Sequence, residues 1–174
     1  MKRVRNSKKE KNEYIDLILR DERDIIGIEL KYVTAEFRYT FGKESFYLTN
    51  QRATDVRCYD TLKDIQRLEN YAKCGLINIG YSIILTNVSH IWKQKLSKKE
   101  NFYDEFRIYD GRTVSGRLNW MTGTSEGTKM KRETPIELRG KYTFYWDNYI
   151  DLKQMNDAES SKNYSFKYAI VKVR

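Results

Sequence analysis

The stretch from Tyr14 to Tyr32, YIDLILRDERDIIGIELKY, predicts two short strands joined by a tight polar turn. Apolar residues alternate with the residues between them, as Ile15, Leu17 and Leu19 in the first strand and Ile26, Ile28 and Leu30 in the second. Alternation with a period of two places the apolar residues of a strand on one face of a sheet and the residues between them on the other face. The intervening Asp21-Glu22-Arg23-Asp24 contains no apolar residue, as is typical of hairpin loops.

The length of the turn predicts the register of this hairpin. If Arg20 pairs with Ile25 across four loop residues, the numbers of paired residues add to 45, and Asp16 lies directly opposite Glu29. Opposed Cβ atoms are roughly 4.5–5.5 Å apart, and like charges at that spacing repel. A divalent cation would remove the repulsion, and carboxylate oxygens suit Mg²⁺ or Mn²⁺. Lys31 lies on the same face, where its ammonium could stabilise developing negative charge or orient a water.

An Asp on one strand and Glu-X-Lys on the next resembles the signature of the PD-(D/E)XK nuclease superfamily. The matching residues are Asp16, Glu29 and Lys31, and Ile15 stands where the signature has proline. The resemblance covers residues 14–32 closely and extends to about residue 86 in the order of elements only. It implies a restriction-endonuclease-like α/β core and metal-dependent hydrolysis of phosphodiester bonds. Asp16, Glu29 and the Leu30 carbonyl would bind the metal, and Lys31 would assist the attacking water.

Two points about this site stay open. The three side chains also fit the solvent face of an ordinary hairpin, in which Lys31 neutralises the carboxylates, and such exposed ion pairs stabilise little. In the family, a helix before the first motif strand often supplies another acidic residue. Only Glu10 and Glu13 lie upstream here, so the sequence does not identify a third metal ligand.

The following segments predict an α/β domain with a mixed sheet and a long covering helix. Residues 33–49 predict a strand pair with a turn at Gly42–Ser45. Residues 51–73 predict a helix with Thr49 or Asn50 as N-cap and Gly75 just after its end. Its apolar stripe comprises Cys58, Thr61, Leu62, Ile65, Leu68 and Ala72. Residues 76–86 predict a central strand, because they are apolar on both faces for much of their length.

The second half of the chain gives weaker signals. Residues 102–109 predict another strand, and residues 110–134 a polar insertion or extended hairpin loop that holds four of the nine glycines. Glu137-Leu138-Arg139 mimics the motif, but no Asp-bearing strand partners it. The next segment contains an aromatic cluster of Tyr142, Phe144, Tyr145, Trp146 and Tyr149. Core packing is its favoured role, and a stacking platform for unpaired bases is the alternative. Residues 164–173 predict a closing strand. We therefore expect one domain over residues 14–174 and a basic flexible arm over residues 1–13.

The composition favours a polyanionic partner, nucleic acid first. The chain has a net charge of +9 and a pI of about 9.4. The candidates for phosphate contacts lie in the arm, on the helix, and beside the polar insertion: Lys2, Arg3, Arg5, Lys8, Lys9, Lys63, Arg67, Lys129, Lys131 and Arg132, with the run from Lys93 to Lys99. A protein partner is also possible.

The sequence argues against zinc and histidine-based catalytic sites and against a membrane or exported location. Cys58 and Cys74 are 16 residues apart without metal-ligand spacing, and His90 is the single histidine. These counts argue against a Cys/His zinc site and against a His-based triad. No apolar run is long enough to span a membrane, and the basic N-terminal segment lacks the apolar core of a signal peptide. With free thiols as well, we expect a cytoplasmic protein without a membrane partner.

The sequence therefore supports two functional hypotheses. The first is a metal-dependent nuclease that uses Mg²⁺ or Mn²⁺ to hydrolyse the phosphodiester bonds of DNA or RNA. The second is a non-catalytic nucleic-acid- or protein-binding module on the same fold, such as an inhibitor encoded by a phage or a mobile element.

Overall fold

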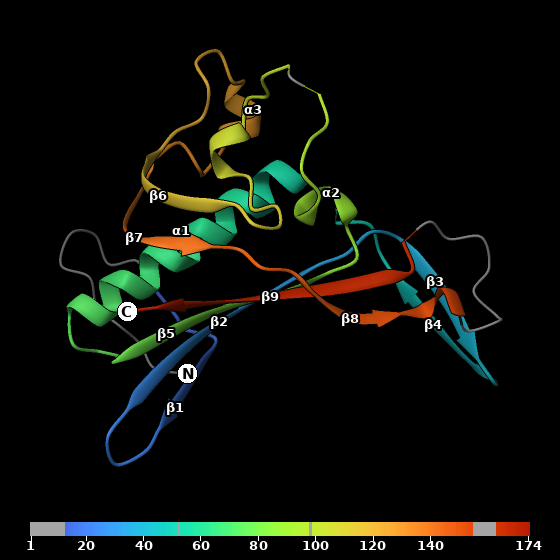
Figure 1. Ribbon diagram of the computed structural model, residues 1–174, viewed down its shortest axis with the longest axis horizontal. Helices are drawn as coiled ribbons and strands as arrows, with labels where there is room; N and C mark the ends of the chain where they lie inside the picture. Colours follow the sequence, from blue (N-terminus) through green and yellow to red (C-terminus); the bar gives the residue numbers. More distant parts are fainter. Residues whose placement is uncertain (1–12, 52, 98, 155–162) are drawn as a thin grey trace.

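The computed structural model describes residues 13–51, 53–97, 99–154 and 163–174 (Figure 1). Its strands are β1 (Leu17–Arg20), β2 (Ile25–Val33), β3 (Phe37–Phe41), β4 (Glu44–Leu48), β5 (Ile79–Thr86), β6 (Thr113–Leu118), β7 (Ile136–Thr143), β8 (Asp147–Asp151) and β9 (Ser165–Val173). Its helices are α1 (Thr54–Lys73), α2 (Ser89–Trp92) and α3 (Glu126–Lys129), with short 3₁₀ turns η1 (Asp104–Phe106) and η2 (Leu152–Gln154). In these ranges, no helix combines the length and apolar character needed to cross a membrane.

The main sheet has five strands in the order β1-β2-β5-β9-β8. β2 and β5 run parallel, whereas the other neighbours are antiparallel, so the sheet is mixed. Helix α1 packs across one face of this sheet, over β2, β5 and β9 (Figure 1). The predicted α/β class, the mixed sheet and the long covering helix are therefore confirmed, as is the central position of β5, which begins at Ile79 rather than Leu76.

A glycine in β5 lets α1 approach the sheet closely. A Cβ added at Gly80 would lie 3.0 Å from the Cβ of Leu68 and 3.2 Å from that of Val173, closer than such atoms normally come. Any larger side chain at this position would push the helix away from the strand. The residue that interrupts the apolar run of β5 is thus needed for helix–sheet contact.

The hairpin of β1 and β2 has the register that the turn length predicts. Arg20 pairs with Ile25 and Leu17 with Ile28, and a side-chain oxygen of Asp21 accepts hydrogen bonds from the Arg23 and Asp24 amides at 2.7 Å each. The alternation does not continue to Ile15. A bend at Asp16 turns the chain, so Ile15 enters the core while Leu17 is exposed. The period of two predicted that Ile15 and Leu17 share a face, and this prediction was wrong.

Helix α1 ends as predicted but begins later. Gly75 has φ +69°, its amide donates to the Ala72 carbonyl, and the Leu76 amide donates to the Tyr71 carbonyl, which is a Schellman motif. The N-cap is Ala53, so the expectation of Thr49 or Asn50 was wrong. The preceding backbone is held by the end of β2 instead, because the Thr34 carbonyl accepts from Gln51 and the Thr34 hydroxyl donates to the Thr49 carbonyl.

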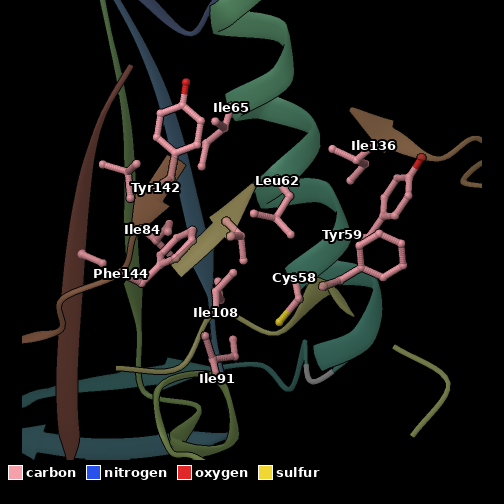
Figure 2. Close-up of a cluster of buried hydrophobic side chains, with 14 of the residues drawn as sticks. Cys58, Tyr59, Leu62, Ile65, Ile84, Ile91, Ile108, Ile136, Tyr142 and Phe144 are labelled. Carbon is pink, nitrogen blue, oxygen red and sulfur yellow. The ribbon is translucent and has the colours of Figure 1, made fainter. Parts of the chain in front are cut away.

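The core lies between α1, the main sheet and the β6–β7 hairpin (Figure 2). The predicted stripe of α1 faces it: Cys58, Thr61, Leu62, Ile65 and Leu68 are buried, and Ala72 is partly buried. Leu62 and Ile65 have no exposed surface, and full burial of such a side chain contributes roughly 1.5–3 kcal/mol. Figure 2 shows Ile84 of β5 and Phe144, which follows β7, on the sheet side of this cluster.

The region from residue 102 to residue 134 differs from expectation. Residues 102–109 contain the 3₁₀ turn η1 and no strand. Asp104 accepts the Asn101 amide at 2.8 Å, and the ring of Phe106 packs on Trp120. Residues 113–118 of the expected loop form β6, which pairs with β7 across a bulge at Ser115/Gly116. The loop that joins these two strands therefore begins after Leu118.

The aromatic segment and the predicted strand pair serve the packing. Tyr142, Phe144 and Trp146 are buried, which confirms core packing for these three, whereas Tyr145 and Tyr149 are exposed. The strand pair over residues 33–49 is confirmed as β3 and β4, which form a separate two-stranded sheet.

A buried carboxylate holds α1 against β7. Glu69 of α1 accepts hydrogen bonds from the amides of Arg139 and Gly140, the shortest at 2.9 and 2.7 Å, and from the Tyr142 hydroxyl at 2.7 Å. Arg139 and Gly140 are the residues of β7 that the register skips, because Ser115 pairs with Lys141 and Gly116 with Leu138. Glu69 therefore replaces the bonds that the irregular ladder leaves unmade.

We expect Glu69→Ala to lower the free energy of unfolding by about 3 kcal/mol, because it leaves several buried donors without an acceptor. Urea denaturation measures the change. Glu137→Ala on β7 is the matched control, since Glu137 is exposed and pairs only with the exposed Arg117, and it should change the free energy by less than about 0.5 kcal/mol. Equal effects of the two substitutions would contradict this role of Glu69.

Candidate active site

Asp16 lies beside the second strand of the hairpin but not in its ladder. The ladder begins at Leu17 and Ile28, and Asp16 occupies the bend before it. Its Oδ2 atom accepts the Leu30 amide of β2 at 2.9 Å. In a strand, the N–H and C=O of one residue point to the same side, so the Leu30 carbonyl also points to this edge of β2. The short β1 thus leaves an edge where a carboxylate and a carbonyl are close.

Glu29 faces α1 from the middle of β2 and is 2% exposed. The Arg67 guanidinium binds both of its carboxylate oxygens, with Nε 3.1 Å from Oε1 and Nη2 2.7 Å from Oε2. Burial raises the pKa of Glu29 to about 7, although Arg67 acts to lower it, and the charges of Asp64 and Asp16 raise it further. The charge of Asp16 therefore reaches Glu29, but the ladder does not pair the two residues as the turn length predicted.

Lys31 extends this contact into a chain of alternating charges. Its Nζ lies 2.7 Å from Oδ2 of Asp64, and Oδ1 of Asp64 lies 3.0 Å from Nη2 of Arg67. Asp64 and Arg67 are three residues apart on α1, just as Glu29 and Lys31 are two apart on β2, so each element contributes one acid and one base. Residues two apart in a strand share a face, so Lys31 and Glu29 both face the helix.

The two ends of the Glu29–Arg67 pair respond differently to burial. Burial acts to lower the pKa of Arg67, but the charges of Glu29 and Asp64 outweigh it and raise this pKa. Burial also raises the pKa of Asp64, against the attraction of Lys31. The guanidinium therefore stays charged throughout the physiological range, and the Glu29 carboxylate is the member of the pair that takes up a proton as the pH falls.

The oxygen atoms of Asp16, Glu29 and Leu30 are of the kind that bind a hard divalent cation. The carboxylates of Asp16 and Glu29 and the carbonyl of Leu30 are oxygen donors, and Mg²⁺ in proteins commonly takes one or two carboxylates and keeps several waters. In the part of the chain that the structure describes, no group of three or more His, Cys, Asp or Glu side chains is placed to hold a metal. Glu13 instead accepts the Tyr71 hydroxyl at 3.3 Å, and Glu10 lies outside the described residues.

Several predicted phosphate contacts are occupied by acidic or polar neighbours. Arg67, a predicted phosphate contact, instead binds Glu29 and Asp64 in the buried charge chain. Arg132 binds both oxygens of Asp60 at 2.7 and 2.8 Å. Lys129 pairs with Glu126, and Lys63 donates to Gln66.

The other predicted contacts are exposed or undescribed. Lys131 is exposed, with φ +65°. In the run from Lys93 to Lys99, Lys95 pairs with Asp104. Lys2, Arg3, Arg5, Lys8 and Lys9 lie outside the described residues. Their role in binding stays a prediction.

Sequence reasoning missed Asp64 as a partner of the site. The signal was present: Asp64 borders the apolar stripe of α1 next to Thr61 and Leu68, where an unpaired charge is costly. A charged residue in that position needs a partner on the facing strand, and Lys31 is that partner.

Comparisons with protein-family models, with curated proteins and with solved structures found no match to this chain.

Proposed function

We propose that this chain is a metal-dependent nuclease that hydrolyses phosphodiester bonds of nucleic acid. The observation that carries the proposal is the placement of Glu29 and Lys31 on one face of β2, with the Asp16 carboxylate bonded to the amide of Leu30 between them. Two carboxylates and an ammonium around one strand are the groups that metal-assisted phosphodiester hydrolysis uses. The resemblance to the PD-(D/E)XK superfamily rests on the same three residues, and a restriction-endonuclease-like core is part of this proposal.

In this proposal, Asp16, Glu29 and the Leu30 carbonyl hold Mg²⁺ or Mn²⁺. When bound, the metal would supply Lewis-acid activation of the phosphodiester and of the attacking water. Asp64 keeps the Lys31 ammonium in place, where it stabilises negative charge that develops on the phosphate. Arg67 balances the charge of Glu29 and holds it toward the helix.

One observation favours a second candidate, a non-catalytic binding module. Glu29, Arg67, Asp64 and Lys31 already satisfy one another within 3.1 Å, so they can serve to hold α1 on β2 without any reaction. The basic surface would then bind nucleic acid or an acidic protein without cleavage. The experiments below separate this candidate from the enzyme.

We expect the chain to cleave DNA or RNA only with Mg²⁺ or Mn²⁺ present. Asp16→Ala, Glu29→Gln and Lys31→Met should each reduce the cleavage rate at least about 100-fold. Each substitution removes a metal ligand or the ammonium, and Glu29→Gln and Lys31→Met do so with little change in shape. A gel assay with labelled single- and double-stranded substrates measures the rates, and circular dichroism checks folding. Glu137→Gln and Lys141→Met are matched controls on β7 and should keep wild-type rates. Full activity in excess EDTA would contradict the proposal.

The pKa of Glu29 gives a second expectation, for metal affinity. Below a pH of about 7 the carboxylate takes up a proton and loses its charge, so Mn²⁺ affinity should fall by up to tenfold per pH unit there and level off above it. Isothermal titration calorimetry from about pH 5.5 to 8.5 measures this dependence. Glu29→Gln should bind Mn²⁺ more weakly and lose most of the slope. A wild-type affinity that does not change over this range would show that Glu29 is not a ligand.

The net charge of +9 predicts nucleic-acid affinity with or without catalysis. The logarithm of the binding constant should fall linearly with the logarithm of the salt concentration, with a slope of about −0.9 per duplex phosphate neutralised. Fluorescence anisotropy with Asp16→Ala measures this without cleavage, and binding should persist because an acid near the phosphate has been removed. If neither duplex nor single strand binds even at low salt, both nucleic-acid functions are wrong, and an acidic protein becomes the partner to seek.

A further inference from the structure

The face of the main sheet that points away from α1 is exposed and apolar. Five large side chains on it keep about half of their surface accessible: Leu17 43%, Leu19 46%, Leu30 53%, Tyr32 49% and Ile170 54%. They come from β1, β2 and β9, so the exposure spans the sheet from one edge strand to the far side of its centre.

The strand registers show that these residues form one continuous surface. Leu30 pairs with Ile83 of β5, and Ile83 pairs with Ile170 of β9, so one row of aliphatic side chains crosses three strands. Directly paired residues in neighbouring strands lie on the same face of a sheet. The next row runs from Leu17 through Ile28 and Tyr81 to Lys172. The Lys172 ammonium lies 6.0 Å from the centre of the Tyr81 ring. The charge is therefore at the margin and not in the centre.

No helix in the described part of the chain covers this surface. Helix α1 and the β6–β7 hairpin pack on the opposite face (Figure 1). The longer segments outside the described residues, 1–12 and 155–162, have the sequences MKRVRNSKKEKN and MNDAESSK. Their apolar residues are only Met1, Val4, Met155 and Ala158, too few to match a surface of this size.

The chemistry of the surface selects its partner. A polyanion needs Lys and Arg, which the centre of this face lacks, so nucleic acid does not fit it. A second copy of the chain also carries a charge of +9, so the charged surfaces of the two copies repel each other. The uncharged apolar face does not add to this repulsion. Two such sheets pack about 10 Å apart with their strands within about 30°.

The exposed area is also sufficient for a dimer. Five half-exposed large side chains, with the partly buried ones between them, offer on the order of 600 Å² per copy, and specific interfaces begin near 1,200 Å² for both partners together. Contiguous apolar patches of this size on soluble proteins mark interaction sites.

We propose that two copies of this chain associate face to face through the open side of the main sheet, in a symmetric dimer. The inference does not rest on the nuclease proposal, because Glu29 and Lys31 face α1 on the other side of the same strand. Dimerisation through this face therefore leaves the Glu29 and Lys31 side chains of both copies outside the interface.

Sedimentation equilibrium from about 1 to 100 µM tests this, since a useful dimer has a dissociation constant in or below that range. We expect the full chain to show twice the 20.9 kDa mass of one chain. Ile170→Lys and Leu19→Lys should each raise the dissociation constant at least about 100-fold, because a charge would be buried in the apolar interface. Neither side chain is buried within one copy, so both variants should keep the wild-type circular dichroism spectrum.

Leu96→Lys is the matched control, because Leu96 is fully exposed and belongs to no strand. It makes the same change of residue type as Leu19→Lys and should leave the dimer intact. Ile170→Ser, which adds no charge, is the milder second variant and should weaken the dimer in the same direction. A wild-type chain that stays monomeric at 100 µM (about the upper limit of a specific weak dimer), or a dimer unchanged by both Ile170 variants, would overturn the inference.

Discussion

The contact between Arg67 of α1 and Glu29 of β2 is the interaction on which the arrangement of helix and sheet depends. Both groups are largely removed from water, and each would be costly there without the other. Deleting one partner of a buried pair typically costs 3–5 kcal/mol, whereas the pair itself adds little net stability. The pair therefore acts mainly by fixing the position of the helix. Only one rotation and one translation of α1 allow Arg67 to contact Glu29 while Asp64 contacts Lys31.

The parts of the fold that could be predicted depend on local geometry. A loop of known length fixes the β1–β2 register, and a glycine with a left-handed backbone ends α1 at Gly75. The parts that could not be predicted depend on contacts between distant segments. The bend at Asp16 serves the Leu30 amide, and the turn at Asp104 is stabilised by the packing of Phe106 on Trp120. Neither contact leaves a periodic signal in the sequence.

The candidate site shows the same division. Strand period places Glu29 and Lys31 on one face of β2, whereas Asp16 reaches the Leu30 amide through the bend before the ladder. Asp64 and Arg67 could not be placed, since the rotation of α1 over β2 is a tertiary property. The two faces of β2 consequently differ in chemistry. One carries buried charges beneath the helix, and the other carries exposed Leu30 and Tyr32.

The place of β9 in the sheet has a consequence for how the chain is made. β9 is the last strand of the described chain, yet it lies between β5 and β8, and its pairing with β5 joins residues far apart in sequence. During synthesis, the hairpin and α1 emerge long before their sheet can be completed. Until β9 arrives, β5 presents an unpaired edge and α1 covers an unfinished core. The nascent protein is thus exposed to mispairing until β9 has been made, and pairing between strands so far apart in sequence is typically slow.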